Sequence, residues 1–179
     1  MIYRITKYDP TLRDAEGRYL PWTWTSYSDI GRAVNGCALC PAAYLETERR
    51  YTDALICILQ ALHVDALRVK ELEPSVRSSA VLQNDFAKKG LSLSAAQADF
   101  LRRVTDISEI SMSDFEVCFQ LQLRECFWCR LVDPQGRAVV WFGYDYYMYM
   151  GARKFRLHWC GKSVRADCTS RHRRLRVVG

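Results

Sequence analysis

Neither a long apolar run nor a complete catalytic or cofactor motif occurs in this sequence. A membrane-spanning helix needs about 20 consecutive apolar residues, so the first absence argues against a membrane protein. The opening segment carries Arg4 and Lys7 where a signal peptide would be apolar, and we therefore expect a cytoplasmic location. The eight cysteines are accordingly expected to be reduced thiols rather than a disulfide framework.

Histidine is scarce, which limits nucleophilic and acid–base catalysis. Of the three histidines, only His63 lies before residue 153, and its expected role is to interact with free carbonyls at a helix end. Cys57 would lie on a different face of that helix, so the two do not form a catalytic pair. Gly161-Lys162-Ser163 has the end of a phosphate-binding motif but lacks its glycine-rich loop. We expect no enzymatic activity and no cofactor, with an uncharacterised enzyme as the weakest alternative.

Cysteine pairs with CxxC spacing occur twice, as Cys37/Cys40 and Cys126/Cys129. Two such pairs could together hold zinc, but they are too far apart for zinc-ribbon spacing. Buried free cysteine behaves as a small apolar residue, and this is the expected state of the pairs. A second partial zinc set consists of His158, Cys160, Cys168 and His172. Few apolar residues surround that set, so we expect no metal, with zinc binding as the alternative.

The excess positive charge is confined to the C-terminal end. Residues 153–179 contain nine Lys or Arg residues and one acid, whereas residues 1–152 contain seventeen basic and nineteen acidic side chains. A near-neutral body with a basic end indicates an appended arm rather than a uniformly basic domain. At 179 residues the chain is long enough for one domain with a real core. We predict a domain over residues 1–151 and a basic tail over residues 152–179, whose composition permits flexibility.

Hydrophobic periodicity predicts a mixture of strands and helices in the body. Residues 2–7 and 65–73 alternate as strands do. Pro41 suits the first turn of a long helix. The residues expected on the buried face of that helix are Tyr44, Tyr51, Leu55, Ile58 and Leu62. A second helix is predicted over residues 94–104, and the rest of segment 73–111 has no assignment.

Residues 115–123 carry the signals of both a strand and a helix. Apolar residues alternate with more polar ones from Phe115 to Leu123, as in a strand. Ser113 and Glu116, however, have the spacing of a capping box, in which two side chains satisfy free amides at a helix start. We predict a helix.

The last part of the body predicts a hairpin. Residues 127–132 and 138–150 are expected strands, and Asp133-Pro134-Gln135-Gly136 fits a type I turn between them. The elements together predict a single α+β domain. Its small, mostly antiparallel sheet would be packed by several helices and would end in this C-terminal hairpin.

An aromatic run over residues 141–150 lies in the second strand of that hairpin and contains four of the ten tyrosines. Alternation places one set toward the core, namely Val140, Phe142, Tyr144, Tyr146 and Met148. The opposite side carries Trp141, Asp145, Tyr147 and Tyr149. We expect this second set to contact a partner, because Tyr and Trp are frequent in interface hot spots.

Several motifs of the body resemble those of a family of small, mostly uncharacterised bacterial proteins. They are Tyr3-Arg4-Ile5-Thr6-Lys7-Tyr8-Asp9-Pro10, Arg13-Asp14-Ala15-Glu16-Gly17, Trp24-Thr25-Ser26-Tyr27-Ser28-Asp29-Ile30-Gly31, Leu123-Arg124-Glu125-Cys126-Phe127-Trp128-Cys129 and Phe142-Gly143-Tyr144-Asp145-Tyr146-Tyr147-Met148-Tyr149. The resemblance covers residues 1–151 and stops before the basic tail. Members of this family are similar to immunity proteins of polymorphic toxin systems, which bind a cognate toxin and block it.

Two functions follow as hypotheses. The resemblance implies an immunity-type binding protein that neutralises a cognate bacterial toxin domain by occluding it. The alternative is nucleic-acid binding through the tail, whose cationic side chains would neutralise phosphates independently of base sequence. The residues expected to do so are Arg153, Lys154, Arg156, Lys162, Arg165, Arg171, Arg173 and Arg174. Neither hypothesis involves a membrane.

Overall fold

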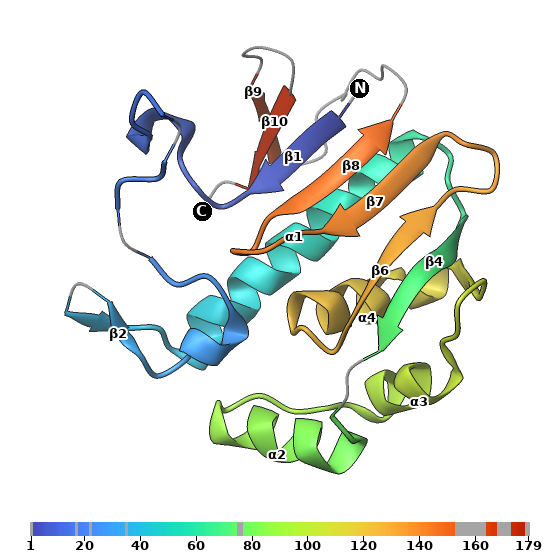
Figure 1. The fold of residues 1–179 in the computed structure, drawn as a ribbon, viewed down its shortest axis with the longest axis horizontal. Helices are drawn as coiled ribbons and strands as arrows, with labels where there is room; N and C mark the ends of the chain where they lie inside the picture. Colours follow the sequence, from blue (N-terminus) through green and yellow to red (C-terminus); the bar gives the residue numbers. More distant parts are fainter. Residues whose placement is uncertain are drawn as a thin grey trace.

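Strands from both ends of the chain lie in one sheet, whose order is β5-β4-β6-β7-β8-β1-β10-β9 (Figure 1). The computed structural model describes residues 2–16, 18–21, 23–34, 36–74, 77–152, 164–167 and 173–177. The strands are β1 (Ile2–Thr6), β4 (Ala66–Pro74), β5 (Glu109–Ser111), β6 (Phe127–Val132), β7 (Ala138–Phe142), β8 (Met148–Ala152), β9 (Val164–Asp167) and β10 (Arg173–Val177). A separate ribbon pairs β2 (Ala33–Val34) with β3 (Cys37–Ala38).

The sheet is antiparallel from β5 to β1. β10 then pairs in parallel with β1, and β9 pairs antiparallel with β10. β8 continues through Ala152, past the boundary predicted at residue 151. With the four α-helices that the structure describes, this arrangement confirms the predicted single α+β domain with a mostly antiparallel sheet.

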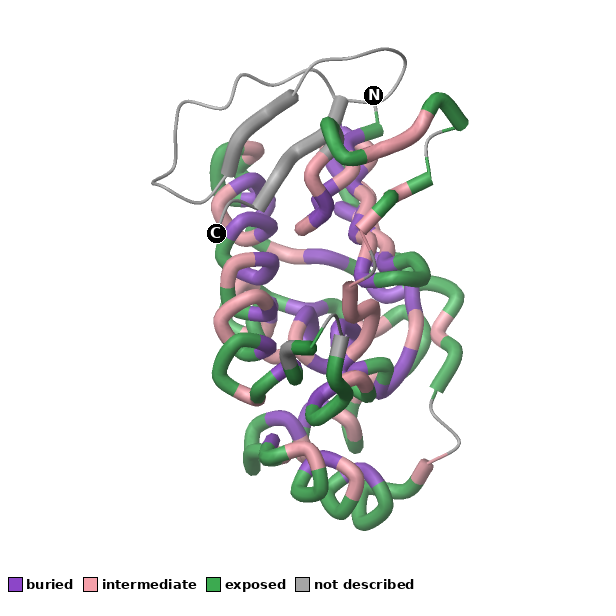
Figure 2. The backbone as a smooth tube through the Cα atoms, turned by 90° about the vertical axis from the view of Figure 1, so that its left-hand side faces the viewer, coloured by how far each residue is buried: buried purple, intermediate pink, exposed green. Residues whose placement is uncertain are grey.

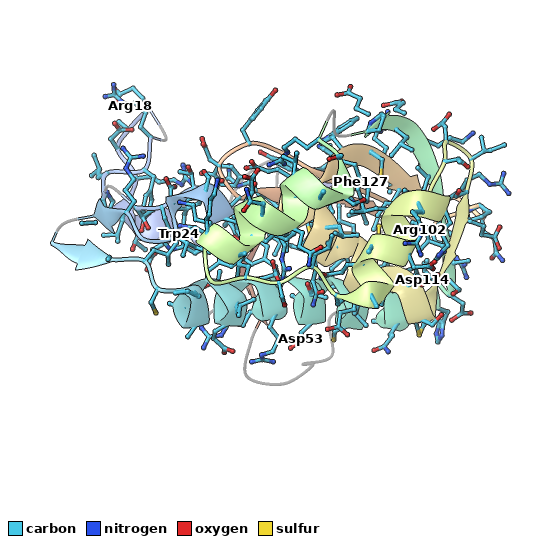
Figure 3. The ribbon with its side chains drawn as sticks, turned by 90° about the horizontal axis from the view of Figure 1, so that it is seen from below. Arg18, Trp24, Asp53, Arg102, Asp114 and Phe127 are labelled. Atoms are coloured by element: carbon cyan, nitrogen blue, oxygen red, sulfur yellow. The ribbon has the colours of Figure 1, made fainter. Side chains whose placement is uncertain are left out.

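The helices are α1 (Pro41–Ala61), α2 (Ser79–Lys88), α3 (Ala95–Arg103) and α4 (Met112–Leu123). α1 and α4 pack together and lie over one face of the sheet, while α3 packs on α4 (Figure 1). Buried residues concentrate between these helices and the sheet (Figure 2). Among the described residues no helix covers the other face. In Figure 3, Asp53 lies on the side of α1 that faces away from the sheet, and the loop with Arg18 rises beyond the sheet on the opposite side.

The long first helix matches its sequence pattern. Pro41 opens it, and the Cys40 thiol accepts a hydrogen bond from the Ala43 amide at 3.4 Å. Of the five residues predicted to be buried, Tyr44, Tyr51, Leu55 and Ile58 are completely buried and Leu62 is half-buried. Burial of apolar surface contributes about 25 cal/mol per Å² to the free energy of folding, so this face is what holds α1 on the sheet.

The predicted helix at residues 115–123 is confirmed, but its expected cap is not. α4 begins after Ser111, whose side chain makes no capping bond to the helix and lies 2.8 Å from the Ser113 hydroxyl. The stabilisation of α4 comes from tertiary burial, since Phe115, Phe119 and Leu121 are inaccessible to solvent.

The single strand predicted over residues 138–150 is wrong. The first hairpin is as predicted, because β6 and β7 are joined by a turn in which the Gly136 amide donates to the Asp133 carbonyl at 2.9 Å. β7 ends at Phe142, however, and the chain reverses before β8 begins at Met148. The aromatic run is therefore a second hairpin.

Candidate functional site

The turn between β7 and β8 has an unusual backbone. Asp145 and Tyr146 have φ values of 57° and 60°, and the Tyr147 amide donates to the Tyr144 carbonyl at 3.2 Å. Two consecutive left-handed residues are the pattern of a type I′ turn, in which Gly, Asn and Asp are preferred. Asp145 suits this conformation and Tyr146 does not, so packing must hold Tyr146 in place.

Aromatic packing supplies that restraint. The Tyr146 ring lies edge-on to Trp24 and Tyr51, with centroids 4.9 Å away in each case, and to Tyr44 at 6.0 Å. The Tyr8 hydroxyl donates to the Asp145 carbonyl at 2.6 Å. The turn is thus attached to α1 and to the N-terminal loop, which fixes the position of the residues around it.

Three of the four residues predicted to contact a partner form an aromatic patch, which we define as Trp141, Tyr147 and Tyr149. They lie on the sheet face that no described helix covers. Trp141 stacks on Tyr149 with centroids 5.4 Å apart and an interplanar angle of 12°. Arg13 donates to the Tyr147 hydroxyl at 2.5 Å, so this ring is also held from the N-terminal loop. All three are half-buried.

The fourth predicted contact residue, Asp145, is exposed at the turn. On the other side of the alternation, Val140, Phe142, Tyr146 and Met148 are buried as predicted. Tyr144 is the exception, because it is 94% exposed instead of lying in the core. The reversal after Phe142 breaks the alternation on which that prediction was based.

A cleft of about 790 Å³ lies beside the turn, and we call it the end cleft. The turn, the ends of β4 and α4, the start of β6 and residues 25–26 supply its walls. Its aromatic lining includes Phe127, Trp128, Trp141, Tyr144 and Tyr147. Its charged lining consists of Glu73, Glu125 and Asp145. The volume is in the range typical of ligand sites.

Four residues of the cleft were not predicted as site residues from the sequence, namely Glu73, Glu125, Trp128 and Tyr144. Glu73 follows a register shift in β4 between Lys70 and Glu73, where Glu71 has a φ of 57°. Such bulges bend a strand and re-aim its side chains. No pattern in the sequence predicts this change of register in β4.

Glu125 occupies a position where glycine is usual. α4 ends in a Schellman arrangement, with the Cys126 amide donating to Leu121 and the Glu125 amide to Gln122, at 2.9 and 3.0 Å. Glu125 has a φ of 55°, which costs about 1 kcal/mol for a residue other than glycine. A carboxylate is therefore kept at the cleft at some expense to stability.

Lys7 lies next to this region in an aromatic setting. Its ammonium donates to the Trp24 carbonyl at 2.6 Å and lies 4.3 Å from the Tyr8 ring centroid. Burial lowers the pKa of Lys7 to about 7, against the carboxylates of Asp29 and Asp145, which raise it.

This lowered pKa predicts that stability rises with pH above neutrality. Between pH 7 and 10.5 the folded chain releases the Lys7 proton while the unfolded chain retains it. The free energy of unfolding should then rise by at most about 1.4 kcal/mol per pH unit relative to the Lys7→Met variant. Urea denaturation of both proteins at pH 7 and pH 9 measures this difference. Equal pH dependence in the two would contradict the assignment.

Among the residues that the structure describes, no group of three or more His, Cys, Asp or Glu side chains is placed to hold a metal ion. Cys126 and Cys129 are buried, and burial raises the pKa of each thiol to about 12. They and Cys118 are free thiols, as is the exposed Cys40, in agreement with the expectation of reduced cysteines. Cys57 departs from that expectation, because it is disulfide-bonded.

The tail residues predicted to bind nucleic acid are only partly placed. Arg165 lies on β9, and Arg173 and Arg174 lie on β10. Arg153, Lys154, Arg156, Lys162 and Arg171 lie outside the described residues, as do His158, Cys160, Cys168 and His172 of the partial zinc set.

Comparison with known proteins adds no relative to this picture. No family model, curated protein or solved structure matches the chain. Among the helices that the structure describes, none is long and apolar enough to cross a membrane.

Proposed function

We propose that this chain is an immunity-type binding protein that neutralises a cognate bacterial toxin domain by occluding it. The aromatic patch, Tyr144 and the end cleft would together form the contact surface. The partner would be a protein, and its inhibition would come from shape and charge complementarity without any chemistry on the toxin.

The observation that supports this proposal most is the uncovered aromatic face beside a firmly held turn. Tyr144 is 94% exposed, and Trp141, Tyr147 and Tyr149 present further aromatic surface next to it. Large amphipathic side chains held by a rigid scaffold lose little entropy on binding and are enriched in interface hot spots. The motifs that resemble the immunity-like family run through the same hairpin.

Co-expression with the neighbouring toxin tests the proposal. The gene for an immunity protein is expected directly downstream of a toxin gene, so the C-terminal domain of that upstream protein is the partner to use. We expect the chain to restore growth to cells that express the toxin domain and to elute with it from a sizing column. If the chain gave neither protection nor a complex, the proposal would be refuted.

Within that complex, Tyr144→Ala should weaken binding by about tenfold or more, since truncation of a hot-spot aromatic costs about 2 kcal/mol. The unfolding midpoint should hardly change, because the side chain is almost fully exposed. Ile107→Ala is the matched control, removing another exposed apolar side chain that is 66% accessible and lies outside the proposed surface. Titration calorimetry compares the affinities, and equal losses in the two variants would contradict a contact at Tyr144.

The alternative proposal, nucleic-acid binding, predicts an affinity for mixed-sequence DNA or RNA that falls steeply with salt. The positive charge of residues 153–179 favours it. Substitution of Arg165, Arg173 and Arg174 by Gln is a better test than deletion, because β10 pairs with β1 inside the sheet. Unchanged binding in that variant would argue against this use of the tail.

A further inference from the structure

The end cleft has a one-sided charge. Its lining contains the carboxylates of Glu73, Glu125 and Asp145 and no Lys, Arg or His. All three residues are exposed. Around the described rest of the chain, by contrast, acids regularly have a basic partner within ion-pair distance. Examples are Asp14–Arg18, Asp99–Arg102, Asp114–Arg103 and Asp133–Arg137, at 2.7, 2.9, 2.6 and 2.7 Å.

Two cations near the cleft, Arg77 and Lys7, donate hydrogen bonds to carbonyl and hydroxyl oxygens rather than to the cleft carboxylates, although the Lys7 ammonium still attracts Asp145. Arg77 donates to the backbone carbonyl of Glu125 and to the Tyr27 hydroxyl, at 2.8 and 2.7 Å. The Lys7 ammonium donates to the Trp24 carbonyl. In the described part of the chain, no ion pair joins a basic side chain to any of the three cleft carboxylates.

Aromatic walls complete the chemistry of the cleft. Trp128 is held by its indole nitrogen, which donates to the Phe142 carbonyl at 2.6 Å. Trp141 is held by its stacking on Tyr149. A planar guanidinium suits both the carboxylates and the aromatic walls of the cleft, because it can bind carboxylates through two parallel hydrogen bonds and can stack on aromatic rings. An ammonium offers a point charge without the stacking surface.

We propose that the end cleft receives the guanidinium of an arginine side chain presented by a partner protein. The identity of that partner rests on the proposed function, whereas the chemistry of the cleft does not. Glu125 and Asp145 would accept its hydrogen bonds, and Trp128 and Trp141 would pack against its plane. The three carboxylates, none of which forms an ion pair with a described basic side chain, would gain a counter-charge in the complex.

A pair of peptides tests the cleft without any toxin. One is a blocked glycine–arginine–glycine peptide, and the other carries citrulline, which has nearly the same shape without the charge. Titration into isotopically labelled protein follows the indole N–H signals of Trp128 and Trp141. We expect the arginyl peptide to shift both signals. The citrullyl peptide should bind about tenfold more weakly or not at all, because hydrogen bonds between charged groups are stronger than those between neutral groups.

Matched variants separate the cleft from the overall charge of the protein. Glu125→Gln with Asp145→Asn removes two negative charges at the cleft and should reduce arginyl-peptide affinity by about tenfold or more. Asp65→Asn with Glu116→Gln removes two exposed charges outside the cleft and should leave that affinity unchanged. Glu125→Gly is a further variant that should fold well, since glycine suits its φ of 55°. This variant should have a higher unfolding midpoint and a lower affinity for the arginyl peptide.

Three results obtained without any toxin would overturn the assignment. They are equal shifts with both peptides, arginyl binding that survives the cleft variant, and self-association that the cleft variant abolishes. The last, read by sedimentation at several protein concentrations, would identify a second copy of this basic-tailed chain as the occupant. A toxin complex that the cleft variant does not weaken would leave the proposed function intact and refute the arginine site. Peptide binding without any toxin complex would do the reverse.

Discussion

Replacement of Arg124 by Ala should lower the free energy of unfolding by about 3–5 kcal/mol, among the largest effects of any single substitution in this chain. The Arg124 guanidinium donates to both oxygens of the Glu48 carboxylate, at 2.7 and 2.8 Å, and to the Ser92 carbonyl at 3.0 Å. Glu48 is 1% exposed and Arg124 is 5% exposed. Without Arg124, the carboxylate would be left buried with no counter-charge.

A second ion pair on the same helix provides the control. Arg49 pairs with the carboxylates of Glu46 and Asp53, but it is exposed. Exposed pairs contribute little because water competes and side-chain entropy is lost, so Arg49→Ala should cause little or no loss. Urea denaturation of both variants makes the comparison. An equal decrease in the free energy of unfolding of the two variants would show that burial does not determine how much these ion pairs stabilise the fold.

Replacing both partners of the buried pair should cost less than replacing Arg124 alone. With Glu48→Met and Arg124→Met, no charge remains to be left unpaired, and the long apolar side chains retain much of the packing. The pair joins the middle of α1 to the residue that follows α4, next to Glu125. A double variant that folds but loses binding to the arginyl peptide would show that the pair positions the cleft as well as stabilising the core.

The elements that were predicted correctly have strong local signals. α1 follows from one apolar face at helical spacing, and the β6–β7 hairpin follows from an Asp-Pro-Gln-Gly turn between two apolar runs. α4 was predicted from a capping box that the structure does not contain. Its apolar residues fit both the strand and the helix period, and tertiary packing selects the helix. α2 was missed because its ten residues bury only Leu82 and Phe86 at the level of the core. A short helix with so small an apolar face has a weak pattern.

The candidate site was less predictable than the fold, for a physical reason. The shared face of Trp141 and Tyr149 was predicted because alternation is a local property of a strand, whereas Tyr147 lies in the turn before β8. The cleft carboxylates come from three separate segments, and one of them, Glu125, is in a left-handed conformation that its residue type does not favour. The Glu48–Arg124 pair joins residues far apart in the chain. Long-range packing determines each of these features, and no window of sequence contains it.

Tyr146 is where local preference and tertiary packing conflict most directly, and its replacement by Ala should lower the free energy of unfolding by about 3–5 kcal/mol. The side chain is 5% exposed and contacts Trp24, Tyr44 and Tyr51. Tyr144→Ala, two residues earlier and 94% exposed, is the matched control and should leave stability nearly unchanged. Thermal and urea unfolding both measure the difference, and similar losses of stability in the two variants would contradict the buried packing of Tyr146.

Substitution of Tyr146 by Gly separates the two opposing effects. Gly removes the same aromatic contacts as Ala, but it adopts the φ of 60° without the steric cost that a Cβ atom imposes. The Gly variant should therefore be more stable than the Ala variant by about 1 kcal/mol, the reverse of the order expected inside a helix or strand. If Ala were the more stable, the turn would have relaxed out of the left-handed region once the ring was gone. The tyrosine ring itself would then hold that backbone conformation, and with it the orientation of Asp145 at the cleft.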